Sequence, residues 1–358
     1  MKLLRWERAM RKLNLVFAFL VFVFLVNCYF YFQQSTNSVS VVFRPLQRPT
    51  NTHSPFNLSA LPANDYRSLL NLKDFRFVLN NNRCNKSANG GFDDSVFLII
   101  FIHSAPNNFK KRLAIRETWG NESNFVNDKI RVIFTLGIVF DPSVQQSIER
   151  ENAEYKDIVQ GNFVDSYRNL SYKHVMGLKW VTYYCQNTKF VFKTDDDIFV
   201  DIFQLMFYLK GWLSEVFPLR NFMSCYVISN PYPKRSVRSK WHVTYEEYPG
   251  KYYPEYCSGW GILMSPDVVF RLYAHSREVS YFWVDDVMIS GLLAQRIGVR
   301  HIDLTSKLAI EDDDVTGWLK KDELSIPPLF GHPDTDTDTI YALWNKSIKY
   351  YRTKYERL

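Results

Sequence analysis

Lys189-Phe190-Val191-Phe192-Lys193-Thr194-Asp195-Asp196-Asp197-Ile198-Phe199-Val200 is the stretch that decides the fold. A short apolar run ends here in three consecutive carboxylates and then becomes apolar again, which predicts a buried strand with acids at its C-terminal end. In open α/β sheets, ligands bind at that edge. Closely spaced Asp oxygens suit a hard divalent cation that keeps positions open for phosphate oxygens. We therefore predict that Asp195 and Asp197 form a D-x-D site for a metal-bound nucleotide.

Two other acidic clusters, 311–314 and 334–338, compete with this interpretation. The second resembles the start of a calcium loop, but Thr339 stands where such a loop needs Gly, and Asn345 stands where it closes with Glu. Neither cluster follows an apolar strand. We therefore predict that both are loops or helix caps.

Composition describes a folded protein with a distinct N-terminus. The chain has 358 residues, of which 46% are hydrophobic, and a formal charge of +7. Residues 1–12 carry five Lys or Arg against Glu7, or +4, which leaves only +3 for the rest. Because that remainder is mildly basic and has no basic stripe, we do not expect nucleic acid as a partner.

An uncharged apolar segment follows at 13–32. About 20 such residues span the hydrocarbon core of a bilayer, and the basic residues before the segment favour a cytoplasmic N-terminus. A cleaved signal peptide is the alternative, but its apolar region is usually shorter and ends at small residues. We predict a cytoplasmic tail at 1–12, a signal anchor at 13–32 and a single-pass type II protein.

The sequons and cysteines agree with a lumenal body. N-x-S triplets occur at Asn57, Asn85, Asn121, Asn169 and Asn345, and we expect glycosylation at all of them except Asn169, which lies inside a motif described below. Beyond the anchor, four cysteines in an oxidising compartment allow two disulfides with three possible pairings: Cys84, Cys185, Cys225 and Cys257.

Residues 33–91 are rich in Ser, Asn, Thr and Pro, which predicts a stem that does not order fully, with some helical spacing and partial order around 65–79. From 92 to 358, apolar runs alternate with helical stretches, so we predict one α/β domain with a mostly parallel sheet. The expected strands are 95–102, 130–136, 189–194, 222–228 and 299–304. The expected helices are 110–119, 143–155, 164–184, 202–213, 266–275, 284–297 and 340–350.

Three further groups of residues carry possible chemistry. Arg112 and Arg116 share a helical face and could bind phosphate, although such pairs are more often a solvated face. The glycines of 253–261 permit close backbone approach beside an aromatic platform, or else form a tight turn. Asp285 and Asp286 begin a helical stretch, where acids stabilise the helix dipole or where one could act as a general base.

The order of these segments resembles the animal β1,3-glycosyltransferase family, the galactosyltransferase and N-acetylglucosaminyltransferase group. The resemblance covers about 95–345 and rests on five motifs in order, found at Arg112–Trp119, Asp165–Lys173, Lys193–Phe199, Tyr253–Gly261 and Asp285–Val287. Asp285 departs from the family pattern, because it replaces the usual Glu.

This resemblance implies a GT-A fold, a UDP-sugar donor, Mn²⁺, inversion at the anomeric carbon and a Golgi membrane location. It assigns Asp286, with Asp285 as the alternative, to the general base, and Asp195, Asp197 and His332 to the metal. It also assigns donor contacts to Arg112, Arg116, Asp165, Lys173, Asp195 and Asp196, and a sugar or acceptor pocket to Tyr256, Gly259 and Trp260.

The leading hypothesis is a β1,3-galactosyltransferase that extends glycans on glycoproteins or glycolipids. A β1,3-N-acetylglucosaminyl- or N-acetylgalactosaminyltransferase is the nearest alternative, because a few pocket contacts decide the sugar. A non-catalytic chaperone or lectin of the same fold is another, but the intact Asp195 to Asp197 argue against it.

Overall fold

The structure is a computed structural model that describes residues 55–84, 96–125, 128–211 and 220–355. Within those ranges no helix is both long and apolar enough to cross a bilayer. The predicted tail and anchor lie outside the described residues.

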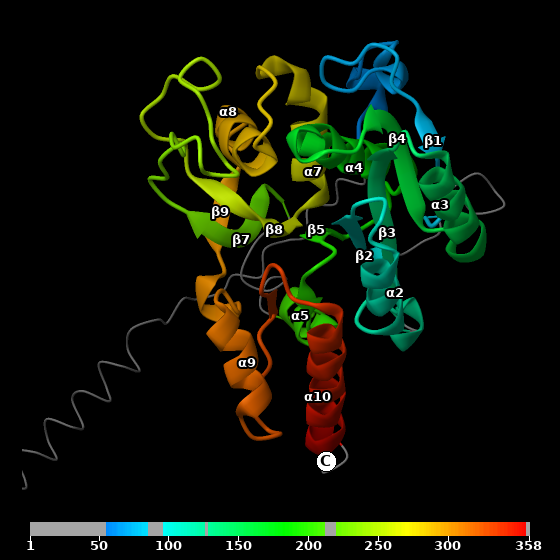
Figure 1. Cartoon of the computed structure of the whole chain (residues 1–358), viewed down its shortest axis with the longest axis vertical. Coiled ribbons are helices and arrows are strands. Elements are labelled where there is room, and N and C mark those ends of the chain that lie inside the picture. Colours follow the sequence, from blue (N-terminus) through cyan, green and yellow to red (C-terminus); the bar gives the residue numbers. More distant parts are fainter. Residues whose placement is uncertain (1–54, 85–95, 126–127, 212–219, 356–358) are drawn as a thin grey trace, which may run out of the picture. The chain divides into compact units, whose positions relative to one another are not determined.

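One eight-stranded sheet organises the described part of the chain, in the order β1-β4-β3-β2-β5-β8-β7-β9 (Figure 1). Strands β4, β3, β2 and β5 run parallel, while β8 is antiparallel to both β5 and β7. This α/β architecture agrees with the predicted class. The strands are β1 (Phe77–Leu79), β2 (Val96–His103), β3 (Lys129–Ile138), β4 (Ile158–Val164), β5 (Phe190–Asp195), β7 (Phe222–Ile228), β8 (Tyr256–Met264) and β9 (Arg300–Asp303).

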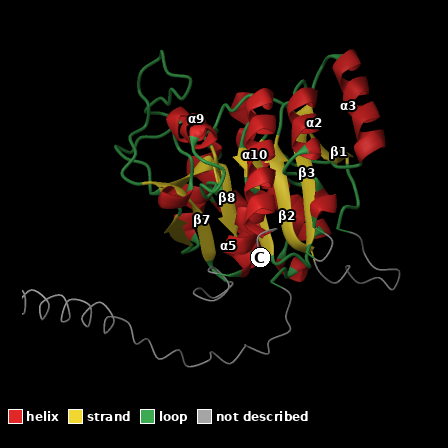
Figure 2. Ribbon diagram, turned by 90° about the horizontal axis from the view of Figure 1, so that it is seen from below, coloured by secondary structure: helices red, strands yellow, loops and turns green. Residues whose placement is uncertain are grey.

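Helices cover both faces of the sheet (Figure 2). The α-helices are α2 (Phe109–Glu117), α3 (Pro142–Tyr155), α4 (Leu170–Tyr184), α5 (Ile202–Lys210), α7 (Pro266–His275), α8 (Ala294–Arg296), α9 (Asp312–Lys320) and α10 (Thr337–Tyr355). A π-helical segment, η6 (Val287–Leu293), precedes α8. Short 3-10 turns lie at 58–60, 65–67, 122–124, 167–169, 276–278 and 305–307.

Two hydrophobic cores result, one on each face. Strand side chains alternate between faces, so in β2 Ile99 joins the core beneath α4 and α7, while Ile100 joins the core beneath α2, α5, α9 and α10. All eight residues of β2 are buried. A strand covered on both faces explains the continuous apolar run seen in the sequence.

A second, two-stranded sheet follows β5. Strand β6 (Phe199–Val200) pairs with β10 (Phe330–Gly331), which brings the segment after β10 to the end of β5. Gly331 has φ of +132°, and a Cβ there would lie 1.9 Å from the carbonyl oxygen of Ala309. Only glycine therefore permits this close crossing.

Residues 55–84 belong to the folded domain rather than to a separate stem, and the predicted partial order around 65–79 is therefore an underestimate. Phe56, Leu69 and Phe75 are buried in the core beneath α4, and β1 pairs with β4. Asp65 is 4% exposed and forms an ion pair with Arg277. Local composition could not reveal these contacts, because every partner lies far along the chain.

Disulfides join Cys84 to Cys185 and Cys225 to Cys257, one of the three predicted pairings. The first ties the N-terminal segment to the end of α4, and the second ties β7 to β8.

The predicted helix from Val164 begins too early, because Val164 ends strand β4 and the helix begins at Leu170. Strand β4 itself was not predicted. Cluster 311–314 caps α9 as predicted, and Asp336 accepts from Thr339 N–H at the start of α10.

Candidate active site

Two strand ends place polar groups at one sheet edge. His103 ends β2 and pairs in register with Asp195, which ends β5. The chain then turns through Asp196 and Asp197, and the Asp196 N–H donates to the carbonyl of His103 at 3.1 Å. The acids therefore lie where a ligand of a parallel sheet binds, as predicted.

A cavity of about 660 Å³ opens at this edge. It brings together most of the predicted site residues: Asp165, Lys173, Asp195, Asp196, Asp197, Tyr256, Gly259, Trp260, Asp285 and Asp286. Of the predicted set, Arg112, Arg116 and His332 are not among the residues that line it.

Asp195 is held by Lys193. The Nζ of Lys193 lies 2.7 Å from Asp195 Oδ1 and also donates to the carbonyl of Gly259. The Asp195 side chain is 35% exposed. Burial raises the pKa of Asp195 to about 6, because it outweighs the opposing charge of Lys193.

Asp196 and Asp197 have different surroundings. Asp196 is buried, and its Oδ2 accepts from Ser104 Oγ at 2.6 Å and Asn108 Nδ2 at 2.9 Å. Asp197 forms an ion pair with Lys111 at 3.2 Å. Asp196 therefore joins the β2–α2 loop to the end of β5, whereas Asp195 and Asp197 are the more accessible acids.

The predicted phosphate contacts of Arg112 and Arg116 need correction. Arg112 is 0% exposed and donates twice to Glu151, and Arg116 donates twice to Asp157. Both guanidinium groups are occupied by buried carboxylates. Arg112 also donates to Ser104 Oγ and to backbone carbonyls of the loop that follows β2, so it supports the cavity wall from behind.

Asp165 and Lys173 both line the cavity but are bonded to the protein. Lys173 Nζ forms an ion pair with Asp165 at 2.9 Å and donates to the carbonyl of Ser104 at 2.6 Å. Asp165 also accepts from the N–H of Gly137. The pair thereby connects the ends of three strands, and its predicted contact with the donor stays a prediction.

Asp285 and Asp286 differ in environment. Asp285 is 5% exposed, and its Oδ2 lies 3.0 Å from Nδ1 of His174, which is fully buried. Against the effect of burial, His174 and Lys193 lower the pKa of Asp285. Burial raises the pKa of Asp286 well above its usual range, and the negative charge of Asp285 raises it further. Asp286 is the less buried of the two, and its higher pKa makes its ionised form the stronger base.

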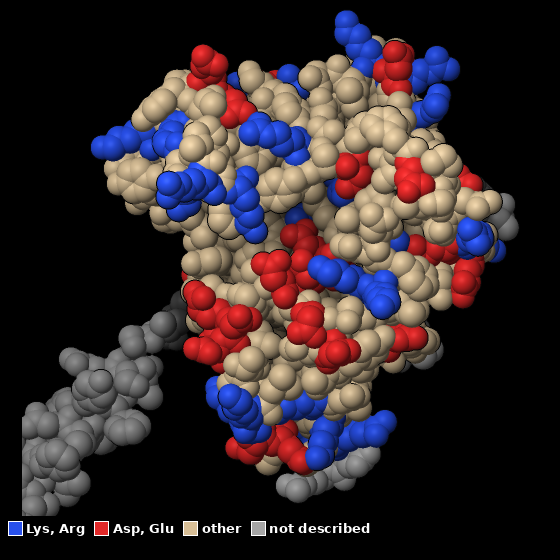
Figure 3. Space-filling view, in the orientation of Figure 1, with Lys and Arg blue, Asp and Glu red and all other residues tan. Residues whose placement is uncertain are grey.

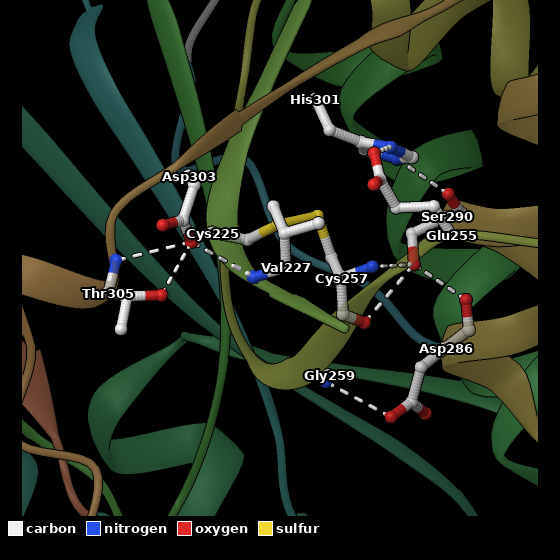
Figure 4. Close-up of a disulfide and its surroundings, with 10 residues drawn as sticks. All are labelled: Cys225, Val227, Glu255, Cys257, Gly259, Asp286, Ser290, His301, Asp303 and Thr305. Atoms are coloured by element: carbon white, nitrogen blue, oxygen red, sulfur yellow. Dashed lines mark hydrogen bonds and ion pairs between the residues drawn. A yellow bond between two sulfur atoms is a disulfide. The ribbon is translucent and has the colours of Figure 1, made fainter. Parts of the chain in front are cut away.

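Backbone contacts fix Asp286. Its Oδ2 accepts from the N–H of Gly259 at 3.1 Å, and a Cβ on Gly259 would lie 3.0 Å from its Cγ. Ser290 Oγ donates to the Asp286 carbonyl and accepts from the N–H of Cys257. Figure 4 shows this chain of contacts from the Cys225–Cys257 disulfide through Ser290 to Asp286. Irregular π-helical turns of the kind that follow here are frequent at functional sites.

The segment after β10 reaches the cavity through Asp334. Thr335 N–H donates to the carbonyl of Asp197 at 3.0 Å, and Pro333 and Asp334 line the cavity. His332 instead has Nδ1 3.3 Å from Asp312 Oδ1. Its role as a metal ligand stays a prediction. Asp334 belongs to the cluster 334–338, which the sequence predicts as a loop or helix cap and not as part of the site.

The predicted sugar pocket residues lie on β8. Tyr256, Gly259 and Trp260 all line the cavity. The Trp260 ring packs against Phe330 with centroids 5.8 Å apart and is 9% exposed. Trp260 is therefore largely covered by the protein and offers little open surface for stacking.

Several site residues were missed. His103 and Ser104 could have been found by the strand-end rule that identified Asp195. His174 is one of several buried polar residues of α4, and a lone buried histidine more often has a structural role. Lys234 and Lys240 lie in the segment 230–250, whose sequence is polar, basic and aromatic but matches no motif.

Among the sequons, Asn57 and Asn345 are exposed, and Asn121 accepts from Ser123. Asn169 donates from Nδ2 to the carbonyl of Val164 at 2.8 Å, which agrees with a structural side chain. Asn85 lies outside the described residues.

Comparison with known proteins identifies the family. The Galactosyltransferase family profile matches residues 110–305, more than half of the chain. "Beta-1,3-galactosyltransferase 1" of Homo sapiens is 38% identical over 231 residues, which cover 64% of this chain and 68% of that protein. "Lactosylceramide 1,3-N-acetyl-beta-D-glucosaminyltransferase B" of Xenopus laevis is 35% identical over 63% of this chain and 59% of that protein.

Solved structures give weaker likenesses. A galactosyltransferase LgtC in complex with donor and acceptor sugar analogues has a TM-score of 0.35 and 13% identity, over 70% of this chain and 95% of that chain. The apo WbbM bifunctional glycosyltransferase has a TM-score of 0.36 and 12% identity, over 73% and 52%. The assignment therefore rests on the sequence match: the chain belongs to the Galactosyltransferase family and is a glycosyltransferase of its β1,3-galactosyltransferase group.

Proposed function

We propose that this chain is an inverting β1,3-galactosyltransferase of the GT-A type that transfers galactose from UDP-galactose to a glycan on a glycoprotein or glycolipid in the Golgi. One observation carries the proposal: the pair Asp195 and Asp197 and the pair Asp285 and Asp286 face the same cavity in a member of this family. Transfer with inversion requires a diphosphate site and a base in one space.

The residues at the β5 end fit a divalent cation. Asp195 and Asp197 offer hard carboxylate oxygens, and Asp334 lines the same cavity. Among the described residues no three such side chains are already grouped as a metal site, so oxygens of the donor diphosphate would complete the coordination. Lys193 and Lys111 now form ion pairs with Asp195 and Asp197, and a metal ion would replace or supplement these positive charges. A bound Mn²⁺ would supply positive charge to the leaving diphosphate.

Asp286 is the proposed base. It accepts the proton of the acceptor 3-hydroxyl while the hydroxyl oxygen bonds to the anomeric carbon. The bond from that carbon to the diphosphate oxygen breaks, and UDP leaves with the electron pair. Asp285 keeps its negative charge through His174 and so favours proton uptake by Asp286.

A transfer assay tests the proposal. The full chain in detergent would be given each UDP-sugar with a panel of β-linked acceptors, with and without a chelator. We expect galactose transfer that needs a divalent cation and falls about a thousandfold in Asp286→Asn. Asp313→Asn, an exposed acid on α9, is the matched control and should leave transfer unchanged.

Two results would change the assignment. Preferred use of UDP-N-acetylglucosamine would make the chain an N-acetylglucosaminyltransferase, which one of the relatives named above supports. No transfer from any donor by a folded chain that binds a glycan or client protein would favour a chaperone or lectin.

A further inference from the structure

The loop between β7 and β8 forms one wall of the cavity. Four of its side chains line the cavity and are themselves exposed to solvent, and we call them the basic-aromatic rim: Tyr232, Lys234, Lys240 and Trp241. Figure 3 shows basic side chains gathered over this loop, at upper left, and acidic side chains gathered near the centre. The site edge therefore has an acidic part and a basic part.

The lysines of the rim differ from the other lysines of the cavity. Lys173 and Lys193 are buried, and each forms an ion pair with an aspartate. By contrast, no carboxylate among the described residues forms an ion pair with Lys234 or Lys240, and the Nζ of Lys240 lies only over the Trp241 ring, 4.5 Å from its centroid. Two positive charges at the cavity mouth are thus not neutralised by the described protein.

Arg235 makes the loop that carries these lysines a defined structure. Its guanidinium donates to four backbone carbonyls at 2.7 to 3.0 Å, those of Val243, Thr244, Tyr248 and Gly250. Lys234 also pairs through its backbone with the segment at His242. The rim is therefore largely formed before a ligand arrives, which lowers the entropic cost of binding.

The aromatic members of the rim suit a sugar. Tyr232 packs against Tyr252 but is still 60% exposed. Lys240 lies over one face of Trp241, which is still 44% exposed, so part of each ring remains open to a ligand. Aromatic side chains combine an apolar surface with a polar tip, and such surfaces can stack on the apolar face of a pyranose. Aromatic contact beside an unpaired ammonium group describes a site for a sugar that carries a negative charge.

We propose that the basic-aromatic rim binds an anionic acceptor glycan, in which a sulfate or carboxylate group near the acceptor hydroxyl pairs with Lys234 and Lys240. This rests on the proposed function, since it names the acceptor class of the same site. The acidic groups at the β5 end serve the metal-bound donor, so the rim faces the remaining space, where the acceptor enters.

Matched acceptors test the proposal. Transfer by the full chain would be measured with one neutral β-linked disaccharide, its sulfated form and its form carrying a uronic or sialic acid. We expect a higher kcat/KM for at least one anionic form, and the comparison of sulfate with carboxylate names the group. The preference should shrink from about 0.1 M to about 1 M salt, as the screening length falls from about 10 Å to about 3 Å.

Lysine variants locate the effect. Lys234→Ala and Lys240→Ala should each lower kcat/KM for the anionic acceptor about threefold, the effect of one exposed ion pair, with the donor KM and the rate with the neutral acceptor unchanged. Lys251→Ala is the matched control, because Lys251 lies in the same loop and is exposed but does not line the cavity. Lys251→Ala should leave kcat/KM unchanged for both the anionic and the neutral acceptor.

Equal use of neutral and anionic acceptors would overturn the proposal while leaving the transferase function intact. A rise in donor KM in the lysine variants, without a change in acceptor preference, would assign these lysines to the diphosphate instead. If no transfer is found, titration of the full chain with the sulfated, carboxylated and neutral disaccharides decides the matter. If neither anionic disaccharide binds more tightly than the neutral one, the proposed function of the rim is refuted.

Discussion

Replacing Arg112 by Met distinguishes a buried support from a phosphate ligand. The guanidinium makes five hydrogen bonds, two to Glu151 and one each to Ser104, Ala105 and Pro106. Removing one partner of a buried ion pair costs about 3–5 kcal/mol. We expect the lower value, about 3 kcal/mol, because Arg116 still lies 2.8 Å from Glu151.

For a domain of this size, that loss corresponds to a fall of about 6 °C in the unfolding midpoint. Thermal unfolding of the full chain at one fixed scan rate measures it, and the donor KM is determined on the same samples below the transition. Lys110→Met is the control, because Lys110 is an exposed neighbour on the same helix. An unfolding midpoint equal to that of the wild type, together with a raised donor KM, would refute the structural role and restore the phosphate contact.

Two further predictions concern stability. Burial raises the pKa of Asp201 to about 6, so the folded state binds the proton more tightly than the unfolded state does. The contribution of Asp201 to the free energy of unfolding therefore falls as pH rises from about 4 to about 6. Asp201→Asn should gain stability relative to the wild type over that range, by about 2–3 kcal/mol above pH 6. Midpoints measured at a series of pH values test this, and a difference that does not vary with pH would contradict it. Replacing Cys225 and Cys257 together by Ser opens a loop with a sequence separation of 32 and should cost about 4 kcal/mol. If the transfer rate per folded molecule also falls, the result agrees with the contact from Cys257 through Ser290 to Asp286. If the stability is unchanged, packing alone holds β7 to β8.

Sequence was sufficient where the signal is local. The apolar run before Asp195 predicts a buried strand, and Asp141 before Pro142 predicts the start of α3, where the Asp141 side chain accepts from Ser143 N–H. The acids at 195–197 follow from the same reasoning, because a strand end fixes where they must lie.

Local pattern failed where distant partners decide. Arg112 and Arg116 present a common phosphate-binding spacing, but Glu151 and Asp157 lie 39 and 41 residues further on. Strand β4 contains Gln160, Gly161 and Asn162, which are poor strand formers. Its Gln160 is fully buried because Gln145 and the carbonyl of Gly137 satisfy its side-chain amide.

The balance of charge in the cavity explains why Asp286, and not its neighbour, is the proposed base. Asp195 pairs with Lys193 and Asp197 pairs with Lys111. Asp285 lies 3.0 Å from Nδ1 of His174, whose pKa burial lowers. Within the described ranges, no cationic side chain forms an ion pair with Asp286, whose carboxyl group contacts the Gly259 N–H and the side chain of Asp285. A carboxylate beside a negative charge and without its own cation favours the protonated form. When it is ionised, Asp286 is therefore a stronger base than Asp285.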